Sequence, residues 1–185
     1  MLARGKVLLG FGANSSGPWG APDETFRRAL LELERRGVRI EAVSGLYRTA
    51  ALGSARQPPY LNAVARAATS LPAPALLRLL KQIEAKAGRR GGRPWGARTL
   101  DVDLLDYKGL IWNWKKRRSG AAFSRRRPLV LPHPEVQMRP FVLRPLMDVA
   151  PHWRHPVLKE SANSLWRRVP KGGQGAVLER AKIAL

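Results

Sequence analysis

The first 107 residues alternate between two patterns of hydrophobic positions. Short apolar or alternating runs predict β-strands at residues 7–11, 38–47, 60–69 and 99–107. Apolar residues at helical spacing predict helices at about 22–36 and 71–87, the first opened by Asp23 and Glu24 and each followed by a glycine.

The same periods predict which side chains are buried. In the strand at 60–69, Ala63 and Ala65 share one face, and Asn62 and Val64 the other. In the helix at 71–87, the apolar stripe is expected to consist of Leu76, Leu77, Leu80, Ile83 and Ala87.

The second half of the chain has weaker periodicity. Residues 109–128 combine tryptophans with two basic runs and predict an insertion or flap. Four prolines then predict loop and short helix up to Asp148, followed by a helix at 161–168 and a C-terminal extension, about 171–185, with its own short helix. Strands interspersed with helices indicate one α+β domain over residues 1–185, a sandwich in which helices pack on a sheet.

Composition adds charge and excludes several classes of protein. The net charge is +21, from 34 Lys and Arg against 13 Asp and Glu, and would attract a polyanion such as a nucleotide or a nucleic acid, although solvated basic surface is the better explanation of the basic clusters. The absence of cysteine excludes disulfides and thiolate metal sites, and no apolar run is long enough to span a bilayer or resembles a signal peptide. We therefore expect a cytoplasmic protein that does not enter a membrane.

Two aspartates in the run RTLDVDLLDY are the strongest chemical signal. On a strand, Asp101 and Asp103 project from the same face, where like charges repel each other unless a cation offsets them. Mg²⁺ bridged to phosphates would do so, whereas the alternative is simple pairing with arginines. By strict alternation, Asp106 points to the opposite face and is structural.

The basic, glycine-rich loop before these aspartates favours the phosphate interpretation. Guanidinium groups donate paired hydrogen bonds to phosphate oxygens, which suits Arg89 and Arg98, whereas Arg90 and Arg93 remain undecided. The sequence contains no P-loop motif, and the turn GFGAN is structural or forms a wall of a pocket. The buried amide expected at Asn62 suits the edge of a heterocycle, although a satisfied turn amide explains it equally well.

The motifs GFGAN, SGLYRTAALG, QPPYLNAV, IEAKAGRR, WGARTLDVDLL and LPHPEVQMRPFVLRPLMDVAP resemble, in this order, the 6-hydroxymethyl-7,8-dihydropterin pyrophosphokinases of folate biosynthesis. The resemblance spans about residues 7–151. It implies a ferredoxin-like three-layer sandwich with an antiparallel sheet, and transfer of pyrophosphate from ATP to the pterin hydroxymethyl group with release of AMP. It also implies two Mg²⁺ ions.

Site residues follow from the resemblance. It implies Asp101 and Asp103 as metal ligands and Arg89 and Arg98 as catalytic arginines. The implied pterin-binding residues are Thr49, Leu52, Tyr60, Asn62, Trp95 and Phe141. The implied ATP-binding residues are Leu77, Glu84, Leu104, His133 and Arg139.

Some positions depart from the family pattern. Ala50 and Ala51 stand where prolines are common, and Pro94 precedes Trp95 where a charged residue is common. We expect ATP and the pterin as partners, no membrane, and a monomer. The competing hypothesis is a basic single-stranded nucleic-acid-binding module, motivated by the net charge and by Trp112 and Trp114 among arginine runs.

Overall fold

A computed structural model describes residues 6–51, 57–89, 97–114, 128–172 and 175–181. Its six-stranded antiparallel sheet has the order β5-β1-β4-β3-β6, with β2 also paired to β4. The strands are β1 (Val7–Ala13), β2 (Val38–Val43), β3 (Tyr47–Thr49), β4 (Tyr60–Thr69), β5 (Asp101–Tyr107) and β6 (Val177–Arg180). The expected antiparallel sheet is confirmed.

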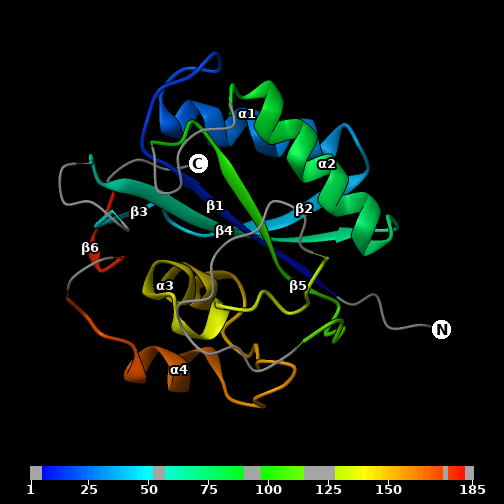
Figure 1. Cartoon of the computed structure of the whole chain (residues 1–185), viewed down its shortest axis with the longest axis vertical. Coiled ribbons are helices and arrows are strands. Elements are labelled where there is room, and N and C mark those ends of the chain that lie inside the picture. The colour runs from blue at the N-terminus through cyan, green and yellow to red at the C-terminus, as the bar shows by residue number, and fades with distance from the viewer. Residues whose placement is uncertain (1–5, 52–56, 90–96, 115–127, 173–174, 182–185) are drawn as a thin grey trace.

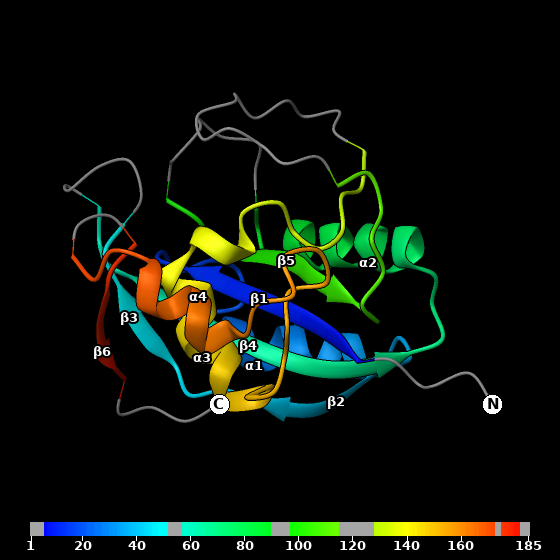
Figure 2. The ribbon, with the colours of Figure 1, turned by 90° about the horizontal axis from the view of Figure 1, so that it is seen from below.

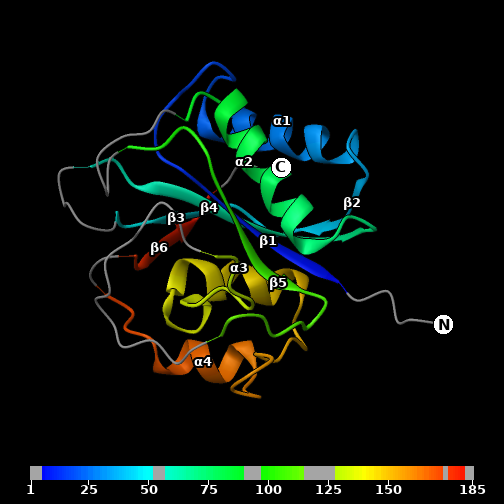
Figure 3. The ribbon, with the colours of Figure 1, turned by 45° about the vertical axis from the view of Figure 1, so that its right-hand side comes forward.

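Helices cover both faces of this sheet. They are α1 (Pro22–Glu34), α2 (Ala73–Lys86), the 3-10 turn η1 (Val136–Met138), α3 (Pro140–Val149) and α4 (Ala162–Arg168). Helices α1 and α2 lie on one face and α3 on the other, with α4 outside α3 (Figure 1 and Figure 3). The α+β, ferredoxin-like layered fold is therefore as the sequence predicts, and no helix among the described residues is long and apolar enough to cross a bilayer.

Alternation along β4 separates two hydrophobic clusters. Ala63, Ala65 and Ala67 belong to the cluster under α1 and α2, whereas Val64 belongs to the cluster under α3. In α2 the buried stripe contains Leu79, while Leu77, expected in that stripe, is half-buried. The face of the sheet beneath α3 is thus the face on which Asn62 lies.

The predicted strand at 38–47 is two strands. Ser44 leaves the regular ladder, because its hydroxyl accepts a hydrogen bond from the Val64 amide at 2.9 Å. The Ser44 amide also donates to the Val64 carbonyl at 2.9 Å, and Gly45 follows before β3 begins. The junction at 44–46 turns the chain so that β3 pairs separately with β4, a change that hydrophobic alternation does not encode.

The C-terminal extension contains a strand where a short helix was predicted. β6 pairs with β3 and covers an edge that would otherwise expose unpaired amides and carbonyls (Figure 2). The predicted insertion at 109–128 is described only at its ends, where Trp112 pairs with Leu131; its central part, 115–127, lies outside the described residues.

A buried histidine lies in the connection between α3 and α4. His155 Nδ1 accepts hydrogen bonds from the amides of Val157 and Leu158, at 3.2 and 3.1 Å. The rings of Trp114 and Trp153 pack against the imidazole, with centroids at 4.9 and 5.8 Å. Burial lowers the pKa of His155 to about 4, so the imidazole is neutral at pH 7.

We expect His155 to make the protein sensitive to acid. Between the ordinary pKa of 6.5 and the folded value of about 4, the unfolded chain binds the proton more readily, so stability is lost as pH falls. The loss from this group is about 2 kcal/mol between pH 7 and pH 4.5. Urea unfolding of wild type and His155→Asn, in which the amide oxygen can still accept from the backbone, measures it. Parallel pH profiles of the two proteins would contradict this expectation.

Candidate active site

One row of residues crosses four strands beneath α3. Tyr47 of β3 lies opposite Asn62 of β4, Asn62 opposite Gly12 of β1, and Gly12 opposite Asp101 of β5. Directly opposed residues of an antiparallel sheet point to the same face. Asn62 and Asp101 are therefore two strand spacings apart, roughly 10 Å at the backbone, with a glycine between them. Tyr47 and the Asn62 amide thus form one end of the row, here called the amide end, and the Asp101 carboxylate forms the other, with no side chain at Gly12 between Asn62 and Asp101.

The amide end of the row is buried and oriented. The Asn62 Nδ2 group donates to the Thr49 hydroxyl at 2.7 Å, and both residues are buried. A Cβ added to Gly12 would lie 3.1 Å from Asn62 Oδ1, so glycine leaves the space beside that oxygen open. Tyr60 lies opposite Thr49, and burial raises the pKa of its phenol, with Arg98 partly opposing the rise. Three of the residues predicted to contact a pterin, Thr49, Tyr60 and Asn62, thus lie together at this end.

The carboxylate end contains both predicted metal ligands on one face. Asp103 lies opposite Gly10, two residues along the strands from the Asp101–Gly12 pair. The register then shifts at Leu105, so that Asp106 lies opposite Leu8 and faces α3 as well. The prediction that Asp106 points to the opposite face is therefore wrong, because a bulge breaks the strict alternation on which it was based.

The structural role predicted for Asp106 is nevertheless supported by its contacts. Its carboxylate accepts hydrogen bonds from the Trp153 indole at 2.6 Å and from the Gly109 amide at 2.9 Å. Burial raises the pKa of Asp106, and these two donors oppose the rise. Asp106 thus joins β5 to the segment after α3.

Two predicted arginines contact the Asp101 carboxylate. Arg89 lies just beyond the C-terminus of α2 and its guanidinium is 2.6 Å from Asp101 Oδ1. Arg98 lies in the loop before β5 and is 2.9 Å from Asp101 Oδ2. The Arg98 backbone is fixed by Asn14, whose side-chain oxygen accepts from the Arg98 amide at 2.8 Å. Two guanidinium groups thus converge at one end of the row.

A buried glutamate supports this arrangement from α2. Glu84 is 2% exposed, and its Oε1 accepts hydrogen bonds from the Val102 amide and from Lys81, each at 2.7 Å. Its Oε2 is 2.5 Å from the Arg89 guanidinium. Burial raises the pKa of Glu84 although Lys81 and Arg89 oppose the rise. Glu84 therefore holds Arg89 beside Asp101.

Asp103 belongs to a second cluster of charged groups. Its Oδ2 is 3.1 Å from the Arg139 guanidinium and 3.9 Å from His133 Nε2. Burial opposes ionisation of Asp103, but the nearby His133 imidazole together with Arg139, Lys81 and Arg89 outweighs it and lowers the pKa of Asp103 to about 2. Asp103 is therefore ionised at neutral pH.

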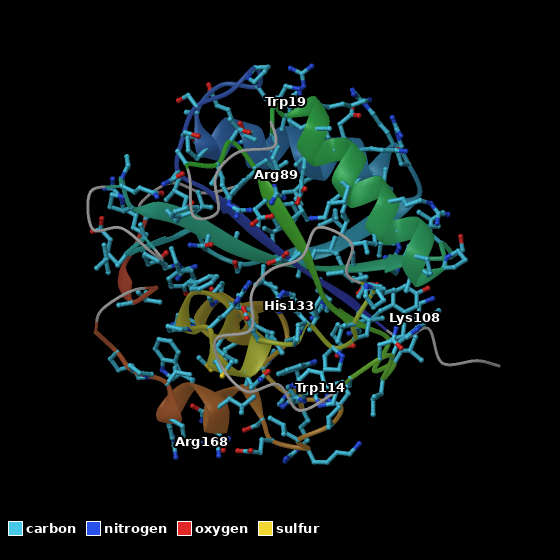
Figure 4. All side chains as sticks on the ribbon, in the orientation of Figure 1. Trp19, Arg89, Lys108, Trp114, His133 and Arg168 are labelled. Carbon is cyan, nitrogen blue, oxygen red and sulfur yellow. The ribbon has the colours of Figure 1, made fainter. Side chains whose placement is uncertain are left out.

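His133 is oriented as a neutral hydrogen-bond donor. Burial, assisted by Arg139, lowers the pKa of His133 to about 4. Its Nδ1 accepts from the Glu135 amide at 3.2 Å, which leaves the proton on Nε2, the atom nearer Asp103. Figure 4 shows His133 beside α3 and Arg89 on the side of α2.

The remaining predicted residues are distributed as follows. Phe141 lies in the first turn of α3, with the Arg139 guanidinium 5.5 Å from its ring centroid. Leu77 is on the same helical face as Lys81 and Glu84, and Leu104 is buried on β5. Leu52 and Trp95 lie outside the described residues.

Four contributing residues were not predicted as site residues. Lys81 and Glu135 each pair with a predicted residue, at 2.7 and 2.6 Å, and Asn14 and Gly12 shape the pocket through the contacts above. Helical spacing between Lys81 and Glu84 was an available signal for the first. Glu135 is likewise only four residues from Arg139. Asn14 and Gly12 belong to the GFGAN turn, predicted to be structural or a wall of a pocket, but their individual contacts are long-range and a local pattern does not record them.

Comparison with known proteins points to the same family as the sequence motifs, and the match covers most of the chain. The sequence profile described as 7,8-dihydro-6-hydroxymethylpterin-pyrophosphokinase (HPPK) matches residues 8–151. The chain is 37% identical over 151 residues to the 2-amino-4-hydroxy-6-hydroxymethyldihydropteridine pyrophosphokinase of Synechocystis, covering 81% of this chain and 69% of that protein. The enzyme of the same name from Aquifex aeolicus is 32% identical over 83% of this chain and 86% of its own length.

Solved structures show the same fold. The HPPK-DHPS protein of Plasmodium falciparum superposes with a TM-score of 0.67 at 13% identity, covering 89% of this chain. The present chain spans 43% of that protein, so only one part of it is matched.

Proposed function

The chain belongs to the 7,8-dihydro-6-hydroxymethylpterin-pyrophosphokinase family, and we propose that the row beneath α3 is where its reaction takes place. The enzyme transfers pyrophosphate from ATP to the hydroxymethyl group of 6-hydroxymethyl-7,8-dihydropterin in folate biosynthesis, releasing AMP. The observation that carries the proposal is the row itself, with Asn62 and Asp101 flanking the open position at Gly12.

The pterin occupies the amide end of the row in this proposal. A flat heterocycle needs an aromatic face and hydrogen-bonding groups at its edge. Asn62, fixed by Thr49, supplies the edge contacts, and Phe141 supplies the ring face. Tyr60 closes the pocket beside them. Leu52 and Trp95 complete the proposed pterin-binding set.

Mg²⁺ binds at Asp101 and Asp103 in this proposal. Mg²⁺ is commonly held by one or two carboxylates and substrate phosphates, and among the described residues no group of three acidic or histidine side chains could hold a metal ion by itself. Two carboxylates on one face, one with a pKa of about 2, fit that pattern. Bound Mg²⁺ would neutralise charge on the phosphates, and the resemblance to the family implies two such ions.

Cationic and neutral donors around the aspartates hold the phosphates. Arg89 and Arg98 contact Asp101 in this structure, and we propose that their guanidinium groups donate to phosphate oxygens of bound ATP. His133 Nε2–H and Arg139 donate from the α3 side. Leu77, Glu84 and Leu104 line the nucleotide side along the outer edge of β5.

The protein needs no nucleophile of its own. The attacking oxygen belongs to the pterin hydroxymethyl group, and the breaking bond lies between the α- and β-phosphates, so AMP leaves. The protein accelerates the transfer by holding the pterin hydroxymethyl oxygen in line with the bond that breaks, and by stabilising the charge that develops on the phosphates. We propose that the protein performs this as a monomer in the cytoplasm.

A direct assay tests the proposed function. Protein is mixed with ATP, Mg²⁺ and 6-hydroxymethyl-7,8-dihydropterin, and nucleotides are separated by chromatography. We expect AMP that forms only when both the pterin and Mg²⁺ are present. ADP as the product would contradict pyrophosphoryl transfer, and AMP without pterin would indicate hydrolysis.

A methyl group at Gly12 tests the open position of the row. In Gly12→Ala the new Cβ lies 3.1 Å from Asn62 Oδ1 and projects between the amide and the carboxylate. We expect the KM for the pterin to rise about tenfold, as for one displaced hydrogen-bonding contact, with a smaller change for ATP. Steady-state kinetics measures both. An equal rise for both substrates would indicate that Gly12 does not face the pterin.

A further inference from the structure

Helix α3 spans the sheet from the metal end of the row to its opposite end. Its ten residues extend about 15 Å, close to the roughly 14 Å of three strand spacings from β5 to β3. At its start, Arg139 contacts Asp103 of β5 at 3.1 Å. At its end, Asp148 contacts the junction of β2 and β3. The helix therefore bridges both halves of the proposed site.

The contact at the end of α3, here called the α3 clasp, consists of Asp148, Tyr47, Gly45 and Arg144. Asp148 Oδ2 accepts hydrogen bonds from the Tyr47 hydroxyl at 2.8 Å and from the Gly45 amide at 3.3 Å. Its other oxygen pairs with Arg144 at 3.0 Å, and the Arg144 guanidinium lies 5.1 Å from the Tyr47 ring centroid. Arg144 and Asp148 are one helical turn apart on α3.

The Gly45 amide is available to the clasp because the strand is interrupted there. Ser44 forms hydrogen bonds with Val64 on β4, and after this interruption the Gly45 amide points toward α3. Burial, followed by the hydrogen bond to Asp148, raises the pKa of the Tyr47 phenol. The phenol therefore remains a hydrogen-bond donor across the neutral pH range.

The clasp is attached to the row that contains the site. Tyr47 is directly opposite Asn62, so its side chain leaves the sheet on the same face and next to the proposed pterin edge. On α3, Phe141 precedes Asp148 by seven residues, or two turns, so both project from the same flank of the helix, beside the stripe of Val142, Leu146 and Val149 that packs on the sheet. A shift of Asp148 against Tyr47 would move Phe141 relative to Asn62.

From these contacts we propose that Tyr47 and Asp148 are positioning residues that set the spacing between Phe141 and Asn62 and thereby the affinity for the pterin. This inference rests on the proposed function. Neither residue needs to touch a substrate. The predicted signature is a loss of pterin affinity that exceeds any loss of ATP affinity, because Arg139 at the other end of α3 has its own anchors in Asp103 and Glu135.

The test compares two tyrosines that each lose one hydroxyl. Tyr47→Phe removes the donor to Asp148, whereas the control Tyr107→Phe removes a hydroxyl that donates to the Leu71 carbonyl at 2.6 Å, at the far end of β5. The Kd of the pterin, with an ATP analogue and Mg²⁺ present, is measured by calorimetry, and steady-state kinetics gives kcat and both KM values. Urea unfolding reports the stability of each variant.

We expect Tyr47→Phe and Asp148→Ala to raise the Kd of the pterin about tenfold, with the KM for ATP within about twofold of wild type. Asp148→Asn keeps an oxygen acceptor for Tyr47 and should recover most of the affinity. Tyr107→Phe should bind the pterin like wild type.

Two results would overturn the inference. One is equal pterin affinity in Tyr47→Phe and Tyr107→Phe, and the other is an equal loss for both substrates in Tyr47→Phe. If wild type itself neither binds the pterin nor forms AMP, the proposed function fails instead, so the two failures are distinguishable.

Discussion

Replacing Asp103 by asparagine is expected to reduce kcat/KM by about three orders of magnitude, which corresponds to about 4 kcal/mol of lost transition-state stabilisation. The substitution keeps the size of the side chain and an oxygen facing the site, but removes the charge that would hold Mg²⁺. Because the pKa of Asp103 is about 2, the wild-type group is fully ionised at assay pH and the whole charge is lost. Kinetics across Mg²⁺ concentrations and calorimetric binding of Mg-ATP measure the effect.

Asp106→Asn is the matched control for Asp103→Asn. Both aspartates are on β5 and face α3, but Asp106 is engaged by Trp153 and Gly109. We expect Asp106→Asn to retain turnover within a few-fold of wild type and to lose some stability. Near-normal turnover in Asp103→Asn at saturating Mg²⁺ would contradict the assignment of the metal site.

Replacing Arg98 by alanine is the second substitution with a large expected effect. Removing a donor aimed at charge that develops in the transition state costs about 10²- to 10³-fold in kcat. Arg98 is a cleaner probe than Arg89, because Arg89 also pairs with the buried Glu84, and its removal would leave that carboxylate with fewer partners. Arg98→Ala should therefore keep most of the stability of the fold.

Arg35→Ala is the control for the loss of one positive charge. Arg35 follows α1 on the other side of the sheet, with its side chain 73% exposed and paired only weakly through Glu32. We expect its kcat to match wild type. If Arg98→Ala and Arg35→Ala have the same kcat, or if Arg98→Ala changes only the KM for ATP, the transition-state role of Arg98 is wrong.

Local patterns were sufficient to predict most of the fold. Strands and helices with a clear period, such as β4 and α1, occur where expected because their alternation reflects which face is buried. The split at Ser44 depends on a hydrogen bond to Val64, twenty residues away, and β6 depends on the free edge of β3. Such pairings are decided by tertiary contacts that a local pattern does not record.

In the candidate site, too, local patterns predict some features and tertiary contacts decide the others. The period of a strand places Asp101 and Asp103 on one face, and the structure agrees. The bulge at Leu105 changes the face of Asp106, a one-residue shift that alternation cannot anticipate. Gly12 gains its significance only from its neighbours across the sheet, and Lys81 from its contact with Glu84.

Phosphorus NMR of the reaction products tests the central claim most directly. Wild-type protein, Mg²⁺, ATP and 6-hydroxymethyl-7,8-dihydropterin are incubated to completion, and the resonances of the products are assigned. The account predicts equal amounts of AMP and of a pterin diphosphate, whose two coupled phosphorus signals belong to an ester at the hydroxymethyl oxygen. A pterin monophosphate with ADP, or an unmodified pterin beside hydrolysed ATP, would contradict it.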